Sequence, residues 1–261
     1  MVKVSKIRSQ QLNTPVTKTK AALNIEEVAR LEVGETPETK ADSLLRLRQL
    51  LEGEPSLKIP SSDDLLVMFL RARKYRVEEA AQMVKNYFRA RRDLPEFFHE
   101  LVPEKVPFRT ICHDHKLLMI SPEPGECGRC MAVVKVGAWS PDICSLLDFT
   151  RAGILLSGSR LLEDVPSICG IECVLDMKGL NIHHLTQLTP SYLMKLANIT
   201  QVHFIGGEAS EFWGRFPGDL VPAVLGGRRE QFDYDRQEKF VHSSSAFFES
   251  LCTCGYRNNK T

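Results

Sequence analysis

The chain has 261 residues, of which 43% are hydrophobic and 26% charged, and its formal net charge is +1. This composition is typical of a soluble globular protein, and the balanced charge gives no global reason to expect binding to nucleic acid. No uninterrupted apolar run approaches the roughly 18 residues that a membrane span needs, since the densest run, from Leu65 to Leu70, has six.

The first twenty residues carry five basic side chains and no acidic one. No apolar stretch follows them, so they do not have the pattern of a secretory signal. We expect a disordered basic tail over residues 1–20. A mitochondrial presequence is the alternative, but only one of the five basic residues is Arg.

The next segment has helical periodicity. From Ala21 to Gly53, Leu, Ala and Val recur at helical spacing and predict two short helices. Ser61 followed by Asp64 fits a capping box at the start of a third helix. The stretch DDLLVMFLRARKYRVEEAAQMVKNYFRARR then predicts a helical hairpin that turns at residues 74–76 and ends before Pro95.

The hairpin is strongly basic in its second part. Residues 71–92 contain eight Lys or Arg side chains and two Glu. This pattern is typical of a solvated helix face. Contact with anionic lipid headgroups is the alternative.

Beyond the hairpin the periodicity changes. Lys116–Ile120 and Met131–Gly137 predict strands, Pro141–Leu162 predicts a helix, Gly170–Asp176 predicts a buried strand, and residues 190–199 predict a further helix. Helices followed by a β-β-α-β-α order predict an α/β core with a mainly parallel or mixed sheet, preceded by a helical subdomain.

Motifs that carry catalysis are missing from the sequence, which has no G-x-G-x-x-G, G-x-x-x-x-G-K-[ST] or G-x-S-x-G. Cys127 and Cys130 have C-x-x-C spacing, but a structural zinc site needs a second pair. Cys252 and Cys254 would supply that pair only with an unusual spacing. An ordinary loop is therefore favoured over a metal or redox site.

Other reactive side chains also favour structural roles. Cys169 and Cys173 lie among apolar residues and are predicted to be small core residues. His183 and His184 are predicted to lie on the surface. Asp176 has no Ser, His or Lys partner at a spacing that indicates a general base. The sequence favours a protein that is not an enzyme, and catalysis by the cysteines or Asp176 is the alternative.

One strand and one helix have faces that fit an apolar ligand. Ile171, Cys173 and Leu175 share one entirely apolar face of the predicted strand. The preceding helix places small and weakly polar residues at i, i+3, i+4 and i+7. An apolar floor with a few hydroxyls suits a pocket for a large hydrophobic ligand, although a packed core has the same periodicity. The helix residues are Thr150, Gly153, Ile154 and Ser157.

Several segments, in the right order, resemble the CRAL-TRIO lipid-binding family. The hairpin stretch is similar to the N-terminal helical domain of that family. GIECVLDMKGL and LTPSYLMKLANITQ resemble its central strand and following helix, and LVPAVLGGRREQFDYD resembles the segment that closes the domain. The resemblance covers roughly residues 25 to 235.

The resemblance implies an α/β fold: a CRAL-TRIO lipid-binding domain, with a mixed or parallel sheet as floor and helices around it, preceded by an all-α N-terminal helical subdomain. The implied division is a helical domain over residues 21–95, a lipid-binding domain over 96–240 that is shortened near 201–202, and a C-terminal tail over 241–261.

The implied function is that of a cytoplasmic, monomeric carrier without catalytic residues, metal, cofactor or nucleic-acid partner. Such a carrier binds a small hydrophobic lipid of the tocopherol, retinoid or phosphoinositide class and transfers it between membranes. Its membrane contact is peripheral and transient, at endosomal or other intracellular membranes, and includes phosphatidylinositol bisphosphate. The implied pocket residues are Val134 and Val136 on one strand, Thr150, Gly153, Ile154 and Ser157 on the helix, Ile171, Cys173 and Leu175 on the floor strand, and Leu196 and Ile199 on the next helix.

One departure from the family pattern is large. In the family, a further strand and a mobile gate helix follow the helix that ends here near Gln201. The missing piece is about one βα unit, on the order of 30 residues. Its loss would expose the pocket lining and remove most of the residues that contact phosphoinositide headgroups. A non-transferring interaction module, or an inactive shortened form, is therefore the alternative function.

Overall fold

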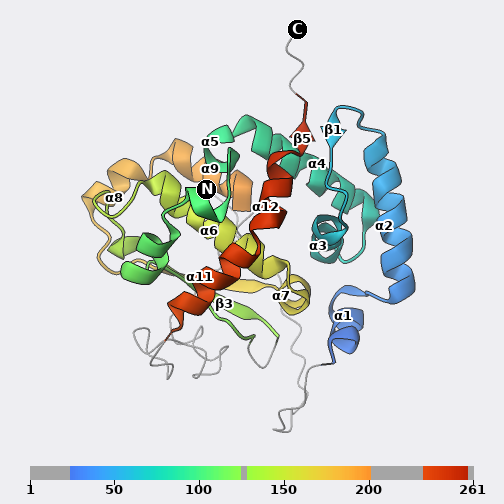
Figure 1. Ribbon diagram of the computed structural model, residues 1–261, viewed down its shortest axis with the longest axis horizontal. Helices are drawn as coiled ribbons and strands as arrows, with labels where there is room; N and C mark the ends of the chain where they lie inside the picture. Colours follow the sequence, from blue (N-terminus) through green and yellow to red (C-terminus); the bar gives the residue numbers. More distant parts are fainter. Residues whose placement is uncertain (1–23, 125–127, 201–231, 258–261) are drawn as a thin grey trace, which may run out of the picture.

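The computed structural model describes residues 24–124, 128–200 and 232–257. Helices dominate it, and the first three lie at one end of the molecule, at the right of Figure 1. No helix within the described ranges is both long and apolar enough to cross a membrane. The N-terminal elements are α1 (Ile25–Val33), α2 (Pro37–Glu52), β1 (Leu57–Lys58), α3 (Asp64–Ala72), α4 (Val77–Asp93) and α5 (Pro95–Phe98).

The first two helices have clear start and stop signals. The side chain of Asn24 accepts a hydrogen bond from the Glu27 amide at the start of α1. Gly34, in the left-handed conformation at φ 75°, ends that helix. Thr36 caps α2, and Pro37 occupies its first turn, where a missing N–H has no cost. The prediction of two short helices is confirmed.

The predicted hairpin is also confirmed, with its turn at Lys74 and Tyr75, both in the left-handed region. The predicted capping box is wrong. Helix α3 begins at Asp64, and Asp63 before it makes no side-chain cap. The carboxylate of Asp63 instead accepts from the guanidinium of Arg48 on α2, with Nε–Oδ1 at 3.1 Å. The Asp63 carboxylate therefore joins α3 to α2 and does not cap the first turn of its own helix.

The central sheet has three strands in the order β2-β3-β4, with β2 antiparallel and β4 parallel to β3. The prediction of a mixed sheet agrees with this arrangement. The strands are β2 (Leu118–Ile120), β3 (Cys130–Lys135) and β4 (Ile171–Asp176).

The middle strand is shorter than predicted. β3 ends at Lys135, and Val136 opens the 3-10 turn η3 (Val136–Ala138). The reason lies at Gly137, which packs against the loop that follows β4. A Cβ at Gly137 would lie 2.7 Å from the amide nitrogen of Leu180 and closer still to the carbonyl oxygen of Lys178. This contact draws the chain out of the sheet.

Helix α6 (Leu146–Leu161) starts later than predicted, at Leu146 rather than near Pro141. Ser145 caps it by accepting from the amide of Asp148 at 3.0 Å. Just before the cap, the indole of Trp139 donates to the carbonyl of Cys144 at 3.1 Å. The Cys144 carbonyl therefore accepts from a side chain in the loop, and residues 141–145 precede the helix instead of forming its first turn. α7 (Asp164–Cys169) packs against α6, and the chain before β2 forms η1 (Pro103–Lys105) and the π-helical turn η2 (Arg109–Asp114).

Residues 241–261, predicted to be a tail, contain the helix α12 (Ser245–Cys252) and the strand β5 (Gly255–Tyr256). Phe248 and Leu251 are buried, at 4% and 2% exposure. The absence of a side chain at Gly158 of α6 lets the Phe248 ring approach closely. β5 pairs with β1 in a two-stranded antiparallel sheet, so the C-terminal segment contacts the N-terminal helices.

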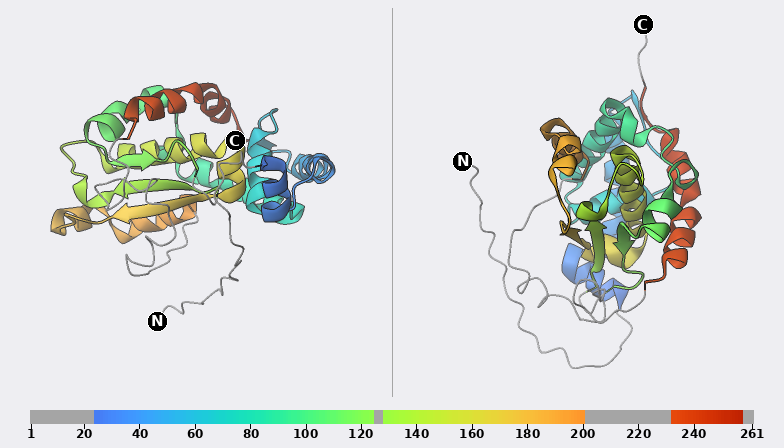
Figure 2. Two further views of the ribbon diagram at one scale, coloured as in Figure 1. Left: turned by 90° about the horizontal axis from the view of Figure 1, so that it is seen from below. Right: turned by 90° about the vertical axis from the view of Figure 1, so that its left-hand side faces the viewer.

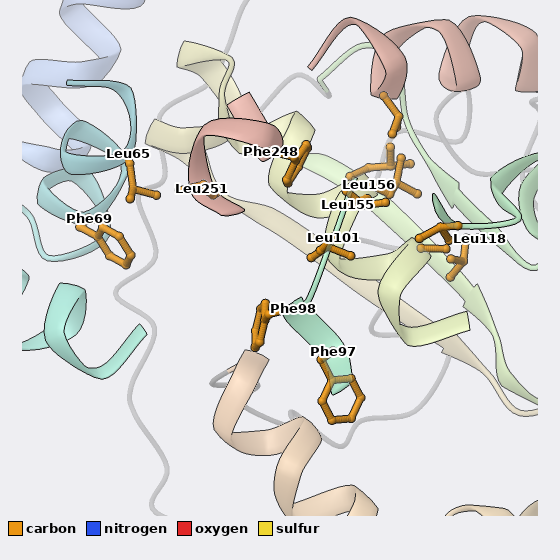
Figure 3. Close-up of a cluster of buried hydrophobic side chains, with 14 of the residues drawn as sticks. Leu65, Phe69, Phe97, Phe98, Leu101, Leu118, Leu155, Leu156, Phe248 and Leu251 are labelled. Atoms are coloured by element: carbon orange, nitrogen blue, oxygen red, sulfur yellow. The ribbon is translucent and has the colours of Figure 1, made fainter. Parts of the chain in front are cut away.

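The remaining helices flank α6 on two sides. Figure 2 shows α6 between the C-terminal helices and the segment formed by α8 (Ile182–Gln187) and α9 (Pro190–Thr200) in both views. Figure 3 shows buried side chains from the N-terminal helices, α5, β2, α6 and α12 that form one hydrophobic cluster. The helices are α8 (Ile182–Gln187), α9 (Pro190–Thr200) and α11 (Tyr234–Ser243).

Candidate functional site

One face of α6 stays partly exposed although the helix runs through the middle of the molecule. The opposite face is buried, with Leu155 at 0% and Leu156 at 4% exposure. A Cβ added at Gly153 would meet no atom of the described residues within 4 Å, so the space beside it is open among them. We call this surface the α6 face, and its residues are the predicted Thr150, Gly153, Ile154 and Ser157.

The hydroxyls on the α6 face turn back onto their own helix. Thr150 Oγ1 donates to the carbonyl of Leu146 at 3.0 Å. Ser157 Oγ donates to the carbonyl of Gly153 at 2.8 Å. Such bonds to the residue four positions earlier occupy the hydroxyl protons. The α6 face is consequently apolar with oxygen acceptors.

Tyr192 of α9 is a residue that the sequence reasoning missed. Its hydroxyl lies 2.6 Å from Thr150 Oγ1 and 3.0 Å from the carbonyl oxygen of Leu146. Its ring packs against Phe97, with 5.6 Å between centroids. Burial raises the pKa of the Tyr192 phenol, and the hydrogen bond with Thr150 acts in the opposite direction. The phenol is therefore neutral at physiological pH.

An ion pair also fixes α9. Lys195 Nζ lies 2.8 Å from Glu96 Oε1, and this hydrogen bond is the main cause that lowers the pKa of Glu96. The other side of α9 exposes Leu193 and Met194, at 46% and 66%. Of the predicted pocket residues on this helix, Leu196 is partly buried. Ile199 lies near the end of α9, and its side chain is outside the described residues.

The predicted strand residues share one face of the sheet. Val134 is opposite Leu175 in the register, and the alternation places Ile171 and Cys173 on the same face. Val134 and Ile171 pack against the main core, whereas Leu175 is 43% exposed. Val136 lies outside the strand, so it does not share the alternation of Val134.

Cys173 is exposed, so the prediction that it is a core residue is wrong. The two cysteines of that prediction differ because β4 is the edge strand among the described strands, and on the face that carries Cys173 the main hydrophobic core covers only Ile171 at its beginning. Cys169, just before β4, is partly buried. The predicted excision after Gln201 and the side chain of Cys127 lie outside the described residues.

His184 is buried, so the prediction that it lies on the surface is wrong, whereas His183 is exposed. His184 Nδ1 accepts from the amide of Asn181 at 3.1 Å, which leaves Nε2–H to donate to the carbonyl of Trp139 at 2.9 Å. Asn181 and His184 form the capping box of α8. This box turns the imidazole inward, where it joins α8 to the loop before α6.

Asp176, named above as the alternative for catalysis, makes a local backbone contact. The carboxylate of Asp176 accepts from the amide of Lys178 at 2.9 Å and so closes the turn after β4. Within residues 24–124, 128–200 and 232–257, no three His, Cys, Asp or Glu side chains are grouped to hold a metal ion.

A small cavity lies away from the α6 face, between α1 and α7. Its volume is about 10 Å³, which holds at most one water molecule and no lipid. It is lined by Ile25, Val28, Gly128, Val165, Ile168 and Cys169.

Comparison with known proteins identifies relatives. Residues 36–105 match the family described as "Pinta-like, UBA domain". The chain is 27% identical over 177 residues to the human alpha-tocopherol transfer protein-like protein, covering 67% of this chain and 51% of that protein. It is 29% identical over 202 residues to clavesin-1 of Xenopus laevis, with coverages of 76% and 58%. Human clavesin-2 is 28% identical over 200 residues, with coverages of 74% and 56%.

The chain thus spans about half the length of the curated relatives that it matches. The matched part covers most of this chain and accords with its mixed sheet and surrounding helices. The homologues of the chain therefore include alpha-tocopherol transfer protein-like proteins and clavesins, which are proteins of the CRAL-TRIO family.

Proposed function

We propose that this protein binds a small hydrophobic lipid, of the tocopherol, retinoid or phosphoinositide class, and transfers it between membranes. The observation that carries the proposal is the α6 face. A helix in the middle of the molecule would bury its whole circumference in an ordinary core. Here one side remains partly exposed, with open space beside Gly153.

Nearby elements also expose large apolar side chains. Leu175 and Met177, at the end of β4 and just after it, are 43% and 46% exposed, and Leu193 of α9 is 46% exposed. Exposed apolar surface of this kind indicates an interaction site. Covering it with a lipid would gain roughly 25 cal/mol for each Å² removed from water. The names of the relatives, which include alpha-tocopherol transfer protein-like, support a lipid of this kind.

The proposed mechanism is exchange rather than reaction. The lipid would lie on the α6 face and the adjoining sheet face, and it would leave when the protein contacts a membrane. We further propose that residues 21–95 form a helical domain and residues 96–240 the lipid-binding domain. We also propose that the protein is monomeric and cytoplasmic, with transient contact to endosomal membranes. The proposed ligand contacts are Val134, Val136, Thr150, Gly153, Ile154, Ser157, Ile171, Cys173, Leu175, Leu196 and Ile199.

The test is native mass spectrometry of the purified protein, followed by lipid extraction. Gly153→Trp would fill the open space on the α6 face. Ala41→Trp adds the same side chain at an exposed position of α2 and is the matched control. We expect the unmodified chain and Ala41→Trp to carry a stoichiometric lipid, and Gly153→Trp to carry much less.

A second candidate function is an interaction module that carries no lipid. The exposed Leu193 and Met194 of α9 favour it, because a protein partner would cover them equally well. A folded monomer without lipid would support this function and overturn the first. Equal lipid content in Gly153→Trp and Ala41→Trp would show that lipid binds elsewhere than on the α6 face.

A further inference from the structure

Three oxygen atoms meet where α9 crosses α6. The hydroxyls of Thr150 and Tyr192 lie 2.6 Å apart. Each also lies 3.0 Å from the carbonyl oxygen of Leu146. All three distances are within hydrogen-bonding range, so the oxygens form a closed triangle.

The triangle has fewer protons than contacts. Each hydroxyl supplies one proton and two lone pairs, and the carbonyl supplies lone pairs alone. The shortest contact, 2.6 Å, needs a proton between the two hydroxyl oxygens. The other proton then goes to the carbonyl of Leu146. Both protons are used inside the triangle, and only lone pairs remain for an outside group.

The triangle adjoins open space. Gly153 lies one turn beyond Thr150 on the α6 face, and a Cβ there would meet no atom of residues 24–124, 128–200 or 232–257 within 4 Å. Thr150 and Tyr192 are both partly exposed. A ligand on the α6 face would therefore meet an acceptor at this end and apolar surface at Ile154.

We propose that Thr150 and Tyr192 select hydrophobic ligands that end in a hydrogen-bond donor, namely alcohols or phenols. This inference rests on the proposed function and specifies the ligand class of the same site. An ether, ester or aldehyde offers only acceptors, so it would bury the lone pairs of the triangle without a partner. The donor would have to come from the ligand, because the two hydroxyls of the triangle have no proton left.

The test uses matched pairs of probes: retinol and its methyl ether, and 1-hexadecanol and its methyl ether. Each probe is offered to the full chain from phosphatidylcholine vesicles, and the bound fraction is measured. The ethers are the more hydrophobic members, so preference for the alcohols cannot come from apolar burial. One net hydrogen bond predicts that each alcohol binds about threefold to tenfold more tightly than its ether.

The key variant is Thr150→Val with Tyr192→Phe, which keeps the shapes of the side chains and removes both hydroxyls. We expect it to bind alcohol and ether equally. Tyr87→Phe is the matched control, because it removes a hydroxyl that accepts from Arg91 on α4, away from the α6 face. That control should keep the full preference.

Three results would overturn the inference: no alcohol preference in the unmodified chain, a preference that survives in the double variant, or one that Tyr87→Phe removes equally. Where the double variant does not fold, Tyr192→Phe alone serves, and an unchanged preference overturns the inference. If alcohols and ethers bind equally well, the proposed carrier function stands without this selectivity. If no probe or cellular lipid binds, the proposed function itself fails.

Discussion

Arg71 and Glu35 form a bidentate ion pair whose side chains are withdrawn from solvent. The Nε–Oε2 and Nη2–Oε1 distances are 2.6 and 2.9 Å, and the side chains are 5% and 12% exposed. Arg71 Nη1 also bonds to Asp164 and Ser167 of α7, at 2.8 and 2.6 Å. One guanidinium therefore joins α3, the loop between α1 and α2, and the helix that precedes β4.

Removing Arg71 should be strongly destabilising. Arg71→Ala leaves the carboxylate of Glu35 withdrawn from water without its cation. Loss of one partner from a buried pair costs about 3–5 kcal/mol. Urea denaturation followed by circular dichroism measures the difference in the free energy of unfolding.

The matched control for this prediction is Arg76→Ala. Arg76 pairs with Glu79 at 3.2 Å, but the two side chains are 62% and 49% exposed. Solvent screens such an exposed ion pair, so its loss should change the midpoint of urea denaturation little. Equal destabilisation by the two substitutions would contradict the view that burial makes the Arg71 pair important.

Glu35 should also make stability depend on pH. Burial acts to raise its pKa, but hydrogen bonds from Arg71 and Tyr75 outweigh burial and leave the pKa below the ordinary 4.5. A carboxyl whose pKa is lowered by folding adds stability above its unfolded-state pKa, and this contribution is lost as pH falls through the folded-state pKa. The cost of Glu35→Gln should therefore be full at pH 7 and shrink as the pH falls below 4.5.

The pH series is measured as the difference in unfolding free energy between the unmodified chain and Glu35→Gln. Repeating the substitution in an Arg71→Gln background provides the control, because the main hydrogen-bond donor to the carboxylate is then gone. The pH dependence should be much weaker there. A cost of Glu35→Gln that grows on acidification would show the opposite sign and refute the argument.

Local pattern was enough to predict the hairpin, β4 and α9, because periodicity and turn residues encode them within a few positions. The local pattern could not predict that Arg71 is buried in an ion pair. In the sequence it belongs to a run of basic residues, whereas in the structure it is buried against a partner 36 positions earlier. His184 is a similar case, since its partner Trp139 is 45 positions away. Pairing across such distances has no periodic signal.

In the candidate site, too, the local pattern predicted some residues and missed others. The spacing of Thr150, Gly153, Ile154 and Ser157 placed them on one helix face, as the structure has them. Tyr192 was not found, because its partner Thr150 is on another helix 42 positions earlier. The sequence around a tyrosine near a helix start gives no signal that its hydroxyl contacts a residue of another helix. Whether these residues bind lipid stays a prediction.

The C-terminal segment should contribute to folding stability. Phe248 of α12 is 4% exposed and approaches Gly158 of α6. Phe248→Ala removes a buried ring and should cost about 3–5 kcal/mol. Phe247→Ala is the neighbouring control, since that ring is only partly buried, and its cost should be smaller. Thermal unfolding of both variants checks this, and equal small shifts would indicate that α12 does not pack on α6.

Two glycines should respond to alanine in opposite directions. A Cβ at Gly137 would press on the backbone of Lys178 and Leu180, which cannot move aside like a flexible side chain. Overpacking of this kind costs about 1–3 kcal/mol. A Cβ at Gly153, which is inside α6, meets no atom within 4 Å in the part of the chain that the structure describes. Alanine there should stabilise the helix by about 0.5–1 kcal/mol.

The two alanine variants are compared by their free energies of unfolding in urea. Opposite signs are expected, because the substitution is the same and only the surroundings differ. Destabilisation by Gly153→Ala would mean that the α6 face is closed rather than open, and the space proposed for the lipid would be lost. Stabilisation together with weaker lipid uptake would mean that the added methyl occupies volume that the ligand uses.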